Sequence, residues 1–148
     1  MSTTVPTSRM TGIGRVLVIV YAVMALAATG RSFVQIFRQF DEAPLAYSLS
    51  ALAAVVYILA TLALVLASRR GWYAVAWVAI VFELAGVLVV GGLSIFFPEL
   101  FPHDTVWSMF GRGYLFIPLV LPVLGISWLR THGPIREPHP ALRAEASA

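Results

Sequence analysis

Three ionisable residues interrupt long apolar stretches of the sequence: Arg31, Glu83 and Arg112. A charge at the centre of a bilayer costs from about 3 kcal/mol upward, so ionisable residues in membrane segments are usually paired or functional. Glu83 lies near the middle of its apolar run, where its side chain is too short to reach water. The spacing predicts a polar cluster in the outer half of a helical bundle, in which one or both arginines neutralise Glu83.

Other polar residues are placed to join this cluster. Gln35 lies one helical turn after Arg31, and Ser50 and Tyr57 of the next apolar run are possible hydrogen-bond partners. Helix rise puts the arginines about 6–9 Å above Glu83, a gap that arginine side chains can close. Two interpretations stay open: a buried ion pair that fixes helix register, or a functional protonatable site. The arginines can also extend to the outer interface instead.

The elements that must position these residues are four apolar runs, at residues 15–37, 45–67, 72–97 and 106–129. Each is long enough to cross a hydrocarbon layer of about 30 Å as a helix. All four are nearly apolar on every side, unlike helices that face water. Because lipid offers no hydrogen bonds to the backbone, helix is the expected form. We therefore expect an all-α fold, a four-transmembrane-helix bundle with a cytoplasmic tail at 1–14 and a disordered cytoplasmic tail at 131–148.

Composition supports a membrane protein. Of the 148 residues, 59% are hydrophobic and 11% are charged, whereas about 25% are charged in a typical soluble domain. Four spans leave little chain for a soluble catalytic domain. The sequence holds no cysteine, no histidine pair at metal-ligand spacing and no recognisable catalytic motif. We expect no enzymatic activity, no cofactor and no metal.

The formal positive charge comes from arginines, since the sequence has no lysine, and most of them flank the apolar runs. This placement favours a role in membrane orientation over binding to nucleic acid, which we do not expect. If the chain crosses four times, one side holds seven arginines: Arg9, Arg15, Arg69, Arg70, Arg130, Arg136 and Arg143. The positive-inside rule puts this side in the cytoplasm and predicts an N-in/C-in topology. Phe96, Phe97, Phe101 and Trp107 would then mark the outer interface.

A cleaved signal peptide is the alternative interpretation of the first run. Arg9 and Arg15 would form its basic region, and residues 25–27 (Ala-Leu-Ala) resemble a cleavage site. The helical pattern continues past that site, and four spans already satisfy the charge bias. We therefore expect the first run to remain as a transmembrane helix.

Several stretches between residues 15 and 130 carry a resemblance to a known family. They are residues 42–47 (EAPLAY), 51–57 (ALAAVVY), 82–91 (FELAGVLVVG), 98–102 (PELFP), 105–108 (TVWS) and 118–125 (PLVLPVLG). Together they resemble a family of small actinobacterial integral membrane proteins. The resemblance implies a four-helix fold in the bacterial cytoplasmic (inner) membrane. It implies nothing about activity or substrate.

Two functions are compatible with these features. The first is a non-enzymatic accessory or assembly partner, in which the chain sits in the lipid bilayer and binds another membrane protein or further copies of itself. The alternative is a small transporter or proton-coupled carrier, in which Glu83 is the protonatable intramembrane site.

Overall fold

The computed structural model describes residues 12–134, which contain helices and no strand. Four α-helices follow one another along the chain: α1 Ile13–Gln39, α2 Pro44–Val65, α3 Arg70–Phe96 and α4 Ile117–Thr131. Three short 3-10 segments connect them: η1 Phe40–Glu42, η2 Pro98–Leu100 and η3 Ser108–Tyr114. The two predicted tails, 1–14 and 131–148, lie outside the described residues except for 12–14 and 131–134.

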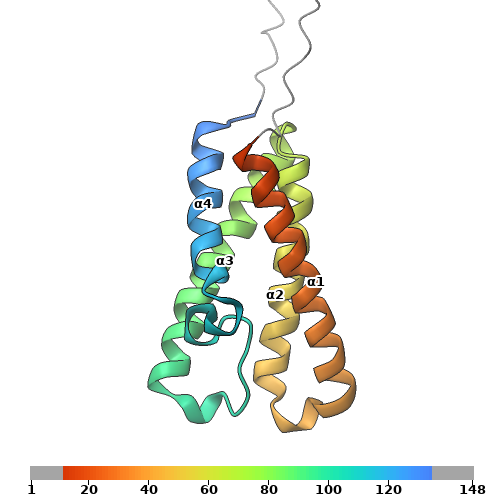
Figure 1. Cartoon of the computed structure of the whole chain (residues 1–148), viewed down its shortest axis with the longest axis vertical. Coiled ribbons are helices and arrows are strands. Elements are labelled where there is room, and N and C mark those ends of the chain that lie inside the picture. Colours follow the sequence, from red (N-terminus) through yellow and green to blue (C-terminus); the bar gives the residue numbers. More distant parts are fainter. Residues whose placement is uncertain (1–11, 135–148) are drawn as a thin grey trace, which may run out of the picture.

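The four helices run along one long axis as a bundle (Figure 1). The start of α1, the α2–α3 turn and the end of α4 lie at one end, and η1 lies at the other end beside the connection that follows α3 (Figure 1). Helix α1 packs mainly on α2, and α3 packs on α2, η3 and α4. The turns therefore alternate between two ends, as a multi-pass bundle requires.

Helices α1, α2 and α3 are each long and apolar enough to cross a membrane. Their bounds differ by one or two residues from the predicted runs 15–37, 45–67 and 72–97. Pro44 begins α2, at the position where its missing N–H costs nothing. Helix α3 ends at Phe96 because the next residue precedes Pro98 and leaves the helical region.

The fourth predicted helix, 106–129, differs from the structure. Helix α4 has 15 residues, about 22 Å of rise, which is short of a hydrocarbon layer of about 30 Å. It follows η3 after a bend of 98°, so the fold has three candidate spans, or four if this bent pair counts as one. Pro118 contributes locally to the break, because it would clash with the carbonyl of Tyr114 in a continuous helix. The backbone is left-handed at Leu115 and Phe116, between η3 and α4.

Residues on the outside of the bundle are mainly large and apolar, and they occur on all four helices, as at Leu26, Val55, Val78 and Val120. Alanine, glycine and serine line much of the interior, which allows the helices to approach closely. An apolar exterior around a small-residue interior is the arrangement expected when the solvent is lipid.

Candidate functional site

The carboxyl group of Glu83 lies in the interior of the bundle, midway along α3, and the residue is 0% exposed. Its Oε2 accepts a hydrogen bond of 2.7 Å from the hydroxyl of Tyr21 on α1. Its Oε1 has no hydrogen-bond partner within residues 12–134. Buried carboxylates normally use both oxygens, so this one is only half satisfied by the protein.

Two further aromatic side chains extend the site from Tyr21. The rings of Tyr21 and Tyr57 have their centroids 6.3 Å apart. The indole Nε1 of Trp107 donates a hydrogen bond of 3.2 Å to the hydroxyl of Tyr57. Trp107 lies against Gly86, where an added Cβ would be 2.7 Å from the indole ring. An aromatic chain thus runs from Glu83 to the loop that precedes η3.

That loop and η3 are fixed to α3 by specific contacts. Thr105 and Ser108 cap each other, because each backbone N–H donates to the other's hydroxyl at 2.8 and 2.9 Å. The backbone N–H of Met109 donates to Ser94 on α3 at 2.7 Å. Phe110 lies over Gly91, where an added Cβ would be 2.6 Å from its ring. The segment is therefore an irregular piece of chain packed into the bundle.

The arginines of the predicted cluster do not contact Glu83. Arg31 donates from Nη2 to the backbone carbonyl of Asp104. Arg112 is exposed and its Nη1 approaches the sulfur of Met109 at 3.6 Å. Within the described part of the chain the one close contact between a basic and an acidic side chain joins His103 and Glu42, at 3.4 Å. Glu83 thus has no arginine as a counter-ion, and its hydrogen-bond partner is the phenol of Tyr21 instead.

The remaining residues predicted for the cluster form no hydrogen bond with Glu83 within the described part of the chain. The Tyr57 hydroxyl accepts its hydrogen bond from Trp107, and the Ser50 hydroxyl is buried with no partner among the described residues. Gln35 is half-buried, and its Oε1 also has no partner there.

Sequence reasoning missed Tyr21 as the partner of Glu83 and placed Trp107 at the outer interface. The second expectation is wrong, because Trp107 is 1% exposed. A tyrosine in an apolar run gives little signal by itself. The signal that could have located Trp107 is Gly86, a small residue one turn from Glu83 that leaves space for a large ring.

The chemistry at this site comes from the carboxyl group of Glu83, and the described residues offer no metal site there. Within residues 12–134 no group of three His, Asp or Glu residues could hold a metal ion. An ionised carboxylate in this position would lack a counter-charge, and a bound proton or a small cation would supply one. The arrangement therefore favours a bound positive charge beside Glu83.

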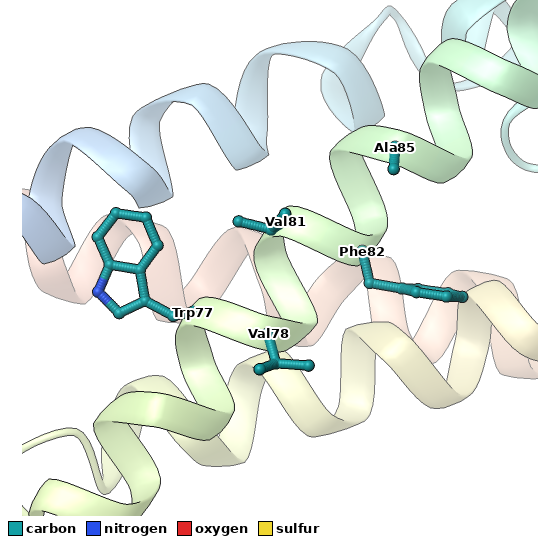
Figure 2. A pocket seen from close by; sticks show the side chains of 5 residues that line it. All are labelled: Trp77, Val78, Val81, Phe82 and Ala85. Atoms are coloured by element: carbon teal, nitrogen blue, oxygen red, sulfur yellow. The ribbon is translucent and has the colours of Figure 1, made fainter.

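An apolar groove lies on the outer face of α3 (Figure 2). Its lining consists of Trp77, Val78, Val81, Phe82 and Ala85, all from α3. Phe82 and Val81 precede Glu83 in the sequence, but they are exposed whereas Glu83 is buried. The groove holds no ionisable or catalytic side chain, so it is a surface for apolar contacts.

The chain matches no protein-family model, no curated protein and no solved structure. The geometry around Glu83 is therefore the main basis for a functional proposal.

Proposed function

We propose that this protein is a small proton-coupled membrane carrier, in which Glu83 binds and releases the proton. The observation that carries the proposal is a fully buried carboxyl group with one hydrogen bond, from Tyr21, and one oxygen without a partner. Ionisable groups in this situation form the proton-binding sites of membrane pumps and transporters. The proposal assigns no catalysed reaction to the chain.

The break before α4 supports the same function. Irregular backbone at membrane depth is tolerated where it is packed in protein or lines a cavity. Many carriers use broken helices of this kind to build their binding sites and to open them. Here the broken part contacts the Glu83 region through Trp107, which packs on Gly86 and bonds Tyr57. A movement of η3 would change the surroundings of Glu83.

Proteoliposomes with an entrapped pH-sensitive dye test the proposal. Phosphate, glutamate, lysine and choline are added outside, one at a time, and proton movement coupled to each solute is recorded. The wild-type protein should move protons with at least one of them, and Glu83→Gln should abolish that movement. Glu99→Gln is the matched control, since Glu99 is exposed in η2 and should leave it unchanged.

Two results would contradict the carrier. One is wild-type flux that equals protein-free vesicles for every solute in the set. The other is equal flux in wild type and Glu83→Gln, which would show that Glu83 takes no part.

The second candidate function is an accessory or assembly partner of a larger membrane complex, or a homo-oligomer. The groove on α3 favours it, because an apolar hollow bordered by Trp77 and Phe82 can receive a helix of another membrane protein. Pull-down in mild detergent should then recover a stable companion or a discrete oligomer. Repeated recovery of the lone monomer would count against this function.

We further propose an N-in/C-in orientation in a bacterial cytoplasmic (inner) membrane. The support is the arginine distribution, together with the alternation of turns between the two ends of the bundle (Figure 1). The Arg69–Arg70 pair lies at the α2–α3 turn, and the acidic residues Glu42, Glu99 and Asp104 lie in the connections after α1 and α3. The acidic connections would then face the outside.

A further inference from the structure

Buried polar atoms without partners are concentrated in the outer halves of α1 and α2. Within residues 12–134 there are five such side-chain atoms: Arg31 Nε, Ser32 Oγ, Gln35 Oε1, Ser50 Oγ and Glu83 Oε1. Four of the five lie close in sequence to η1, the connection between α1 and α2. A buried polar atom without a hydrogen bond costs about 1–3 kcal/mol, so these four atoms hold hydrogen-bonding capacity that the described residues do not use.

The helical hairpin places these atoms at similar depth. Gln35 follows Ser32 by three residues and Arg31 by four, so it neighbours both on the surface of α1. Ser32 precedes Asp41 by nine residues and Ser50 follows Asp41 by nine. In an antiparallel hairpin centred on η1, both serines therefore lie about 14 Å from the turn. They are 5% and 0% exposed, so both hydroxyls are enclosed by protein.

The two serines also leave unused a hydrogen bond that their helices offer. Serine and threonine in a helix commonly donate to a carbonyl one turn earlier. Thr61 does so to Tyr57 at 2.7 Å, and Ser94 does so to Gly91 at 2.9 Å. Ser32 and Ser50 make no such bond. Each of these hydroxyls therefore keeps a hydrogen-bond donor that the described residues do not use.

Arg31 gives the group its charge. One of its terminal nitrogens donates to the backbone carbonyl of Asp104, and its Nε–H is buried and unused. The side chain of Asp104 forms no ion pair with it, and Glu42 is paired with His103. The guanidinium thus has free donors and no carboxylate partner within residues 12–134. An arginine in this state binds carboxylate or phosphate through paired N–H donors.

We propose that Arg31, Ser32 and Ser50, with Gln35 at the edge, form a binding site for an oxyanion, a carboxylate or a phosphate, that enters from the end of the bundle carrying η1. This inference rests on the proposed function in one respect, since it takes the oxyanion to be the solute that the carrier moves. Binding itself is independent of transport, so the two can fail separately. The anion has two possible sources, a free solute or a lipid headgroup, and both present the same oxygens to Arg31.

Thermal unfolding of the full chain, followed by tryptophan fluorescence, tests the site. In an uncharged detergent, sodium phosphate and sodium glutamate are compared with sodium chloride at equal ionic strength. In lipid nanodiscs, phosphatidylglycerol is compared with phosphatidylcholine. A raised unfolding temperature with phosphate or glutamate supports a site for free solute. A rise with phosphatidylglycerol alone supports the site and assigns it to a lipid headgroup.

Variants separate binding from structure. Arg31→Gln should weaken the apparent affinity for the anion about tenfold or more, as loss of a charged hydrogen-bond donor predicts. Arg38→Gln is the matched control, an exposed arginine in the last turn of the same helix. Ser32→Ala should weaken affinity about threefold to tenfold while the anion-free protein is at least as stable as wild type. If Ser32 only supported the fold, its replacement would not lower the affinity for the anion while leaving the anion-free protein as stable as wild type.

Three results would overturn the site: no rise with any anion or with phosphatidylglycerol, equal loss in Arg31→Gln and Arg38→Gln, or unchanged affinity in both Arg31→Gln and Ser32→Ala. Glu83→Gln distinguishes the two proposals. It should keep anion binding in detergent, so binding without any coupled proton movement would leave the site in place and remove the carrier.

Discussion

The hydroxyl of Tyr21 donates a hydrogen bond of 2.7 Å to Oε2 of Glu83, across 62 residues of sequence. The bond joins α1 to α3, although α1 packs mainly on α2, and α3 packs on α2, η3 and α4. It therefore crosses the interior of the bundle. It is the one hydrogen bond that Glu83 makes with a side chain in the described part of the chain.

Replacing Tyr21 with phenylalanine should destabilise the protein by about 1–3 kcal/mol, because the buried carboxyl group loses its donor. Unfolding in detergent at fixed pH measures the change. Tyr114→Phe is the control, since this half-buried tyrosine makes no hydrogen bond through its hydroxyl within residues 12–134. In a double-mutant cycle, Tyr21→Phe should cost clearly less when Glu83 is already replaced by leucine. Equal costs in both backgrounds would show that the bond contributes nothing.

Gly86→Ala should destabilise the protein by about 1–3 kcal/mol, because the new methyl group would lie 2.7 Å from the ring of Trp107. Gly92→Ala on the same helix is a matched control with nothing within 4 Å of the added Cβ. It should be neutral or stabilising by about 0.5–1 kcal/mol. Unfolding temperatures of the two variants in one detergent provide the comparison, and a cost at Gly92 as large as at Gly86 would refute the packing of Trp107.

Leu115→Gly should raise stability by about 1 kcal/mol. Leu115 has a φ of 55°, in the left-handed region that favours glycine, and is 84% exposed, so little packing is lost. The same substitution at Leu124, an exposed residue within α4, should cost about 1 kcal/mol. Thermal unfolding of both variants tests the conformation of the break. If Leu115→Gly destabilises as much as Leu124→Gly, the chain continues as a helix there.

Cysteine labelling tests the proposed orientation at one chosen position at a time, since the chain has no cysteine of its own. Glu99→Cys in η2 and Ser68→Cys in the α2–α3 turn replace exposed residues at opposite ends of the bundle. A membrane-impermeant maleimide should label Glu99→Cys in intact cells and Ser68→Cys after lysis alone. The reverse pattern would invert the orientation, and labelling of both in intact cells would exclude alternate turns on opposite sides.

The sequence was sufficient to predict the first three helices, because long apolar runs bounded by Pro44, Gly71 and Pro98 leave few other choices in lipid. It was not sufficient for the fourth. Residues 106–129 are apolar enough for a helix, and hydropathy carries no information on backbone angles. The left-handed conformations at Met109 and Phe110 depend on contacts with Ser94 and Gly91, which no local pattern reveals.

The site was predictable in part. Glu83 stood out because a charge is rare in an apolar run, and the structure places it in the interior. Its partner did not stand out, since charge pairing favoured arginine over a tyrosine in another run. Arg31 bonds a backbone carbonyl in a loop 73 residues away. Contacts of that kind depend on how the loop folds over the helix ends, which single-residue patterns do not encode.

Gly86 and Gly91 on α3 leave space that the rings of Trp107 and Phe110 fill. This packing bears on how the protein assembles in the membrane. The segment after residue 105 is irregular and α4 is short, so neither is well suited to partition into lipid alone. We expect η3 and α4 to assemble on α3 after the first three helices have inserted, with Gly86 and Gly91 as the positions on which they pack. A chain that ended near residue 97 would lack Trp107 and Phe110, and Gly86 and Gly91 would then lie without the rings that pack on them.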